Sequence, residues 1–353
     1  MKKIVRKVRT LRDRIMSPVV TRMKLSGAGS RGAAGFYYGF FSSSFKREQS
    51  AFLAGYKAYH HTLSYPTGSL ALLRRNIHRL EKGILMKPRR TPFALSYIGE
   101  TLDAFCSCSK DGVCLVDREE FSWASDVLEQ YFEIHAKEQG LAELQKRFEQ
   151  ARIEGSGAGE RVPYLRALEE PPSVSYEDLL ELSRRRRSVR WFLEKKVERK
   201  LLDKALLIAA QSPSACNRQP FRFHFFDDSE FVSKVAKLPM GTGGYSHQIP
   251  VIGVVIGQQR NYFNERDRHV IYIDSSLATM SFLYALETVG LSSCCINWPD
   301  VENKERKLQE LIGLEADERV IMLLAIGYPD SNGMVAYSSK KGLDELRIFN
   351  MEK

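Results

Sequence analysis

The sequence predicts a fold that combines α-helices with buried β-strands, and three observations support this. The chain has 353 residues, more than one typical domain of roughly 100–200 residues, and 43% are hydrophobic, as in globular proteins. From about Glu48 to Gln150, apolar residues recur mostly at helical spacing. In the second half, the apolar runs "IPVIGVVIG" and "VIMLLAIG" have the length of buried strands, and helical patterns lie between them.

The first 25 residues form a basic amphipathic segment. In "MKKIVRKVRTLRDRIM", Ile4, Val8, Leu11 and Ile15 recur at helical spacing, and cations cover the remaining surface. Such a helix could lie on an anionic membrane surface, or it could be a solvated helix docked on its own protein. Residues 26–47 are rich in Gly, Ala and Ser, and we predict that they form a flexible connection.

Residues 48–154 are predicted to form a helical domain. Leu73, Ile77, Leu80 and Ile84 share one stripe of an amphipathic helix. The segment "CSCSKDGVC" contains three cysteines, Cys106, Cys108 and Cys114. Their spacing matches no familiar zinc pattern, so no metal site is predicted.

Cysteine usage and hydropathy bear on localisation. Six cysteines in a long chain without a secretory signal, two of them adjacent inside an apolar run, predict reduced thiols and a cytoplasmic protein. No apolar run approaches the ~20 residues that a spanning helix needs. We therefore expect the protein not to cross a membrane.

Residues 155–175 read as a linker, and residues 176–353 as a second domain. Ser175 followed by Asp178 predicts the start of a helix that runs into the arginines of "RRRRSVRWF". Because successive helical residues are turned by about 100°, these arginines cannot all face one ligand. If the chain is extended after the helix, Ser188 and Arg190 point to the same side. A phosphate group suits this arrangement better than nucleic acid, which needs a longer basic stripe, and no nucleic-acid partner is predicted.

A polar turn follows the next helix of this domain. That helix carries Leu202, Ala205, Leu206 and Ala209 on its inner face, it ends at Ser212-Pro213, and a strand begins near Phe221. The turn contains small hydrogen-bonding residues, which are Ser214, Asn217 and Gln219.

Together these two segments resemble the nitroreductase family of flavin enzymes. The Arg-Ser-x-Arg-x-Phe motif is represented by Arg187, Ser188, Arg190 and Phe192, and the Pro-Ser-x-x-Asn-x-Gln-Pro loop by residues 213–220. A long central helix opened by Asp274 and closed by Gly290, a strand over residues 293–296, and Gly-Tyr-Pro at residues 327–329 also resemble the family. So does the basic C-terminal "SSKKGLDEL". The resemblance extends over residues 176–346.

The resemblance implies an α+β fold with a central, mainly antiparallel sheet flanked by helices. It implies a homodimer with FMN at the subunit interface and with NADH or NADPH as electron donor. Arg190 would stabilise the reduced flavin near N1 and O2, and Asn297 and Trp298 would lie beside its active face. The cofactor-binding residues that it implies are Arg186, Arg187, Ser188, Arg190, Pro213, Ser214, Ala215, Asn217, Gln219, Ile296, Asn297, Lys340 and Lys341.

The sequence departs from the family where many members carry a lysine or an asparagine that contacts the flavin ring. This chain has the Gly-rich "LPMGTGGYSHQIP", which is either a turn or a source of backbone amides for the ring.

The predicted function is that of an FMN-dependent oxidoreductase with ping-pong transfer to a small organic acceptor. The chemistry resides in the flavin, so no catalytic side chain is predicted. The sequence does not distinguish among three kinds of electron acceptor, which are nitro compounds, quinones and a specialised metabolite. "RRNIHRLEKGIL" is similar to extensions on bacterial members that are associated with surface-polysaccharide genes. The alternatives are a flavin-binding interaction or regulatory module without turnover, and an FMN-dependent dehydrogenase.

Overall fold

The chain divides into two units, Met1–Leu53 and Ala54–Lys353. The computed structural model describes residues 19–64, 71–110, 118–152, 159, 161–166 and 171–350. The basic helix expected within the first 16 residues and Cys114 lie outside these residues.

In the first unit, residues 19–27 are helical, and α2 (Arg31–Phe36) and the π-helix η1 (Tyr37–Phe41) follow. The segment expected to be a flexible connection, residues 26–47, thus contains α2 and η1. The division between the units falls within α3 (Lys46–Ser64). The domain boundaries read from the sequence stay predictions.

A helical region opens the second unit. It contains α4 (Ala71–Ile84), α5 (Ile98–Lys110), α6 (Arg118–Ile134), η3 (Gln139–Leu141) and α7 (Ala142–Ala151). The apolar stripe predicted on α4 is confirmed, because its four residues are at most 3% exposed and pack against α5 and α6. Gly83 lies close to the ring of Phe93, so a side chain at this position would collide with it.

The C-terminal part combines helices with four strands. Its helices are α8 (Tyr176–Arg185), α9 (Arg199–Ala209), α10 (Ser229–Ala236), α11 (Val270–Thr288), α12 (Glu302–Ile312) and α13 (Leu343–Leu346). Its strands are β1 (Phe221–Phe226), β2 (Val251–Gln258), β3 (Ser292–Asn297) and β4 (Glu318–Gly327). Its single-turn 3-10 helices are η4 (Ala215–Asn217), η5 (Ser246–Gln248), η6 (Gln259–Asn261) and η7 (Glu265–Asp267).

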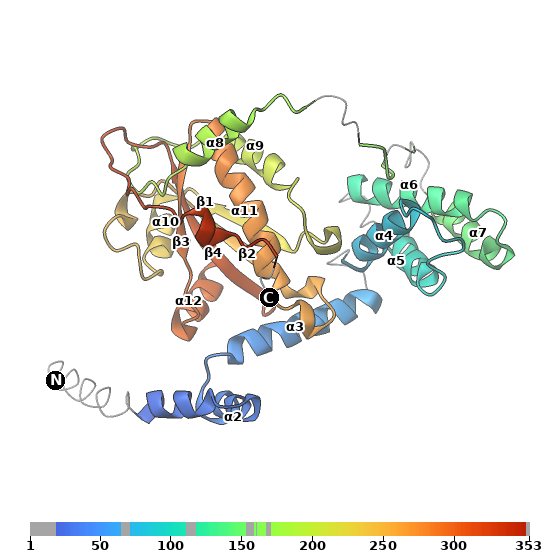
Figure 1. Cartoon of the computed structure of the whole chain (residues 1–353), viewed down its shortest axis with the longest axis horizontal. Helices are drawn as coiled ribbons and strands as arrows, with labels where there is room; N and C mark the ends of the chain where they lie inside the picture. The colour runs from blue at the N-terminus through green and yellow to red at the C-terminus, as the bar shows by residue number, and fades with distance from the viewer. Residues whose placement is uncertain are drawn as a thin grey trace. The chain divides into compact units, whose positions relative to one another are not determined.

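The four strands form one antiparallel sheet in the order β1-β2-β4-β3, with helices on both faces (Figure 1). Alternate residues of β2 and β4 supply the two faces, as the period of a strand requires. One face packs with α9 and α11, and the other packs with α10 and α12. The α+β expectation is therefore confirmed. Both β1 and β3 are edge strands, on opposite sides of the sheet.

Two predicted helix boundaries can be compared with the structure. The capping box of Ser175 and Asp178 is confirmed at the start of α8. The central helix α11 does close before Gly290, which adopts φ +78°, but it begins at Val270. The prediction that Asp274 opens it is therefore wrong. Asp274 is 3% exposed and lies inside the helix, where its carboxylate accepts hydrogen bonds from other segments.

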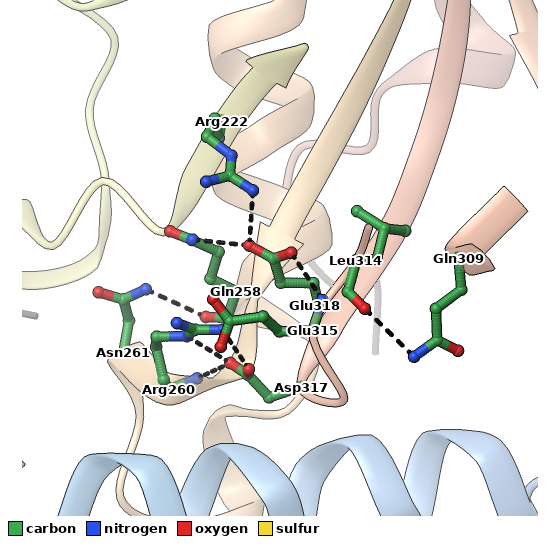
Figure 2. Close-up of polar contacts among 9 residues, drawn as sticks. All are labelled: Arg222, Gln258, Arg260, Asn261, Gln309, Leu314, Glu315, Asp317 and Glu318. Carbon is green, nitrogen blue, oxygen red and sulfur yellow. Dashed lines mark hydrogen bonds and ion pairs between the residues drawn. The ribbon is translucent and has the colours of Figure 1, made fainter. Parts of the chain in front are cut away.

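A polar network joins three strands at one end of the sheet (Figure 2). The buried carboxylate of Glu318 accepts hydrogen bonds from Arg222 of β1 at 3.0 Å and from Gln258 of β2 at 3.0 Å. Beside it, the Nε of Arg260 donates to Asp317 at 2.8 Å. Charged hydrogen bonds are stronger than neutral ones, so this network fixes the end of the sheet at which β1 begins.

Candidate cofactor site

The arginine-rich segment leaves its helix before the motif residues. α8 ends at Arg185, and Arg186 already has an extended conformation. Ser188 then pairs with Ser293 of β3, and Val189 N donates to the same residue's carbonyl at 3.0 Å. Further along, Phe192 pairs with Pro329. Residues 186–192, which we call the strap, therefore lie along the edge strand β3 and the end of β4.

The arginines of this segment have different surroundings. Arg184 is exposed on α8. The Nε of Arg186 is buried and has no hydrogen-bond partner. Arg187 donates to the backbone carbonyls of Ala336 and Tyr337, which ties the C-terminal segment to the strap. A buried donor without a partner is costly, so Arg186 is suited to an acceptor from outside the chain.

Arg190 is exposed at the far end of the strap and has few contacts of its own. Its Nη1 donates to the Ser188 carbonyl at 3.3 Å, and its guanidinium lies 5.8 Å from the ring centre of Tyr245. Burial raises the pKa of Tyr245 to about 12, together with Cys294, whereas Arg190 opposes this shift. The Tyr245 hydroxyl is thus neutral at neutral pH, and it lies 3.9 Å from the Cys294 sulfur.

Tyr245 was not among the residues predicted from the sequence. It lies in the Gly-rich loop before β2, and only the fold brings that loop to Arg190, whose carbonyl accepts a hydrogen bond from Gln248 at 2.9 Å. The amides of Tyr245 and Ser246 already donate to the carbonyl of Thr242, at 3.0 and 2.9 Å. These two amides therefore form hydrogen bonds within the loop.

Strand β3 presents alternate residues beside the strap. Cys295 and Asn297 are exposed, whereas Ile296 and Trp298 are buried. The Trp298 indole donates to Glu305 at 3.0 Å. Trp298 is thus a core residue, whereas Asn297 is accessible.

Cys295 was not among the site residues predicted from the sequence. It could have been found, because residues two apart in a strand face the same side and Cys295 is two residues before Asn297. Although Cys295 is exposed on the surface of the single chain, the protein atoms around its thiol, followed by Cys294, raise its pKa to about 11, and Arg186 opposes the shift. The thiol is therefore neutral at neutral pH and is not an activated nucleophile. The opposing effect of Arg186 also indicates that its charge lies near β3.

The polar turn predicted before β1 has an unusual backbone. Cys216, Asn217 and Gln219 have φ values of 53°, 51° and 48°, in the left-handed region that is unfavourable for residues other than glycine. Bonds within the turn stabilise it: Gln219 N donates to Ser214 Oγ at 3.0 Å, and Gln219 Nε2 donates to Asn217 Oδ1 at 3.0 Å.

The interior of the protein also holds this turn. Ala215 N donates to Asp274 Oδ2 at 2.9 Å, and the Tyr262 hydroxyl donates to the same oxygen at 3.2 Å. Burial raises the pKa of Asp274, although these two hydrogen bonds lower it. The guanidinium of the buried Arg218 lies 5.0 Å from the centre of the Tyr262 ring. Backbone in an unfavourable conformation persists only where the surrounding structure holds it in place. Such residues are common at functional sites.

The predicted site residues form two separate groups. Arg186, Arg187, Ser188, Arg190, Ile296 and Asn297 gather at the β3 edge. Pro213, Ser214, Ala215, Asn217 and Gln219 precede β1, on the opposite edge, and Pro220 accepts from Gln258 N at 2.9 Å. Three strand spacings of about 4.8 Å put the two edges roughly 14 Å apart. Within one chain the two groups therefore start from opposite edges of the sheet.

Lys340 and Lys341 lie in an exposed C-terminal segment. Lys341 forms an ion pair with Glu345 at 3.7 Å. The bonds from Arg187 to residues 336 and 337 bring only the start of this segment to the strap.

Within the described part of the chain, no group of three or more His, Cys, Asp or Glu side chains could hold a metal ion. None of the helices described there is long and apolar enough to cross a membrane.

Comparison with known proteins identifies the family of the C-terminal part. The model described as "Nitroreductase family" matches residues 183–243 and 245–328, which include the strap, the polar turn and all four strands. The chain thus contains a nitroreductase-family domain with the nitroreductase-like fold, preceded by a helical region.

Among curated proteins, iodotyrosine deiodinase 1 of Pongo abelii is 23% identical over 270 residues, covering 68% of this chain and 90% of that protein. Iodotyrosine deiodinase of Hydra vulgaris is 22% identical over 254 residues, covering 61% and 92%. Among solved structures, an FMN-dependent nitroreductase from Clostridium difficile is 23% identical with a TM-score of 0.43, covering 49% of this chain and 99% of that one.

Proposed function

We propose that the protein is an FMN-dependent oxidoreductase that takes electrons from NADH or NADPH and passes them to a small organic acceptor in a ping-pong cycle. The observation that carries this proposal is the strap, in which a buried unpaired Nε of Arg186 and the exposed Arg190 lie along one strand edge in a nitroreductase-family domain. A cluster of cationic donors of this kind suits a phosphorylated cofactor.

The residues of the chain fit FMN. Arg186, Arg187 and Ser188 would hold its phosphate and ribityl groups, with Lys340 and Lys341 joining from the C-terminal segment, and Arg190 would lie near the pyrimidine edge of its ring. Asn297 would contact the ring from β3, and Ile296 would contribute its backbone, because its side chain is buried in the core. The bound flavin supplies hydride acceptance and electron donation, so the protein must bind, orient and electrostatically bias it. A neutral Cys295 thiol and a neutral Tyr245 hydroxyl are compatible with this role.

A homodimer would complete the site. The turn residues Pro213, Ser214, Ala215, Asn217 and Gln219 would reach the flavin held by the partner's strap, because one chain keeps the two groups on opposite edges. The outer surfaces of two helices support this arrangement. Ile273 and Leu277 of α11 are 56% and 44% exposed, and Leu207 and Ile208 of α9 are 68% and 54% exposed. Helices that are apolar on their outward sides are typical of buried interfaces.

Reductive removal of halogen from an aromatic substrate is a second candidate activity. The similarity to iodotyrosine deiodinases supports it, because the matched region covers about two thirds of this chain and most of each deiodinase. Nitro compounds and quinones, or a metabolite of surface-polysaccharide synthesis, remain the acceptors expected from the sequence. A flavin-binding module without turnover and an FMN-dependent dehydrogenase are the alternatives to a reductase.

Anaerobic addition of NADH or NADPH to the FMN-loaded protein tests the enzymatic proposal. Bleaching of the flavin near 450 nm, followed by reoxidation with a nitroaromatic, a quinone or an iodophenol, would identify donor and acceptor classes. If neither NADH nor NADPH reduces the bound flavin, the result would favour a flavin-binding module without turnover.

A cytoplasmic location with peripheral contact to an anionic membrane surface is also proposed. Residues 14–47 contain six Lys or Arg and no Asp or Glu. Exposed apolar side chains accompany these cations on residues 19–41: Val19, Leu25, Phe36, Phe40 and Phe41. Cations together with exposed aromatic residues are typical of segments that bind anionic interfaces.

A further inference from the structure

We propose that Arg74 of α4 is a positioning residue that holds the polar turn of residues 214–219 in its cofactor-binding conformation. This makes the helical region, which lies outside the matched family residues, a structural component of the flavin site. The proposal rests on the proposed function for the identity of the ligand, but not for the conformation of the turn.

The first argument is the contact itself. Arg74 Nη1 donates to the backbone carbonyl of Asn217 at 3.3 Å. Asn217 is one of the three turn residues with positive φ, and the contact therefore acts on the strained part of the backbone. Asp274 holds the same turn from the interior through Ala215 N. The turn is thus held on two sides, by α11 and by α4.

The second argument is that Arg74 is itself fixed. Its Nη2 donates to Glu120 Oε2 at 2.8 Å, and its Nε lies 2.7 Å from Glu120 Oε1 in an ion pair, so the carboxylate of α6 holds the guanidinium at two of its nitrogens. The side chains of Arg74 and Glu120 are only 20% and 5% exposed. A planar guanidinium with two of its nitrogens engaged has a defined direction for the third, which is the one that reaches Asn217.

The third argument is the close packing around the contact. A Cβ atom at Gly55 of α3 would lie 2.6 Å from the Cβ of Gln259, in the segment that follows β2. The guanidinium of Arg75, adjacent to Arg74, lies 4.7 Å from the ring centre of Phe263. The two contacts join α3 and α4 to the segment between β2 and α11. Arg74 is therefore part of a packed junction.

The test separates the effect on the turn from the effect on stability. Arg74→Met removes the donor but also leaves the buried Glu120 without its guanidinium, which destabilises the helical region. The double variant Arg74→Met with Glu120→Gln removes both charges and should regain most of the lost thermal stability. Lys82→Gln removes one charge from an exposed position on the same helix and serves as the matched control.

Two measurements report on the turn. Fluorescence titration with FMN should show about three- to tenfold weaker binding in both Arg74 variants and no change in Lys82→Gln. The loss is smaller than that expected for a lost charged contact to FMN itself, because Arg74 acts on the turn and not on the ligand. In the protein without FMN, labelling of Cys216 with a maleimide, resolved by peptide mass spectrometry, should be faster in both Arg74 variants, because Cys216 lies within the turn.

If the double variant regains both the FMN affinity and the labelling rate of the wild type, Arg74 acts through stability alone and the proposal is overturned. Unchanged FMN affinity and unchanged labelling in Arg74→Met would overturn it as well. If the wild type binds no FMN but Cys216 labelling still rises in both Arg74 variants, the positioning role of Arg74 stands and the cofactor assignment fails.

Discussion

Replacement of Arg190 with alanine separates cofactor binding from folding, because this side chain makes few contacts with the rest of the protein. It is exposed, its side chain donates to the carbonyl of Ser188 at 3.3 Å, and its guanidinium lies 5.8 Å from the ring centre of Tyr245. Its loss should therefore change the free energy of unfolding by no more than about 0.5 kcal/mol, as is usual for surface substitutions.

The effect on FMN should be much larger. A charge-assisted hydrogen bond contributes about 1.5–3 kcal/mol, so Arg190→Ala should weaken FMN binding about ten- to a hundredfold. It should also lower the reduction potential of the bound flavin, since a cation near the pyrimidine edge favours the anionic reduced form. Fluorescence titration of the apoprotein measures the affinity, and a thermal melt measures the stability.

Arg184→Ala is the matched control, because Arg184 carries the same charge on the exposed side of α8. Its FMN affinity should remain near that of the wild type. Equal weakening in the two variants would indicate a general basic patch, and wild-type affinity in Arg190→Ala would refute the assignment of the strap as a flavin clamp.

Three further predictions concern stability and the membrane. Leu80→Ala removes a side chain with no exposure from the α4 core and should lower the free energy of unfolding by about 2–5 kcal/mol in urea titrations; a loss below about 1 kcal/mol would contradict this packing. Burial raises the pKa of Asp274 above its ordinary 3.8, so its ionisation should cost stability as pH rises from 3.8 through the raised value. Thermal melts should show this decline weakened in Asp274→Asn, and an identical pH profile would argue against it. Deletion of residues 1–16 should weaken sedimentation with anionic liposomes while flavin reduction survives, because the cations and exposed apolar side chains of residues 19–47 remain; equal sedimentation would favour a solvated or internally docked helix for the deleted segment.

Local features of the fold could be predicted from the sequence. The stripe of Leu73, Ile77, Leu80 and Ile84 depends only on helical periodicity, and the capping box of Ser175 depends on four adjacent residues. The strands could be predicted because the apolar runs "IPVIGVVIG" and "VIMLLAIG" have the length of strands and are too short for typical helices.

Features that depend on tertiary contacts could not be predicted. Asp274 reads as a helix start because acidic residues favour that position, yet it lies inside α11, where it accepts from Ala215 and Tyr262. Tyr245 reaches Arg190 only through the folding of the loop before β2. The positive φ values of the polar turn depend on contacts at both of its sides, and nothing in the sequence around it contains that information.

The most direct test of the central claim is the visible absorption spectrum of the purified protein, followed by release and identification of its chromophore. The account predicts flavin bands near 370 and 450 nm and released FMN, with about one FMN for each chain. A colourless protein that also fails to take up added FMN would contradict it.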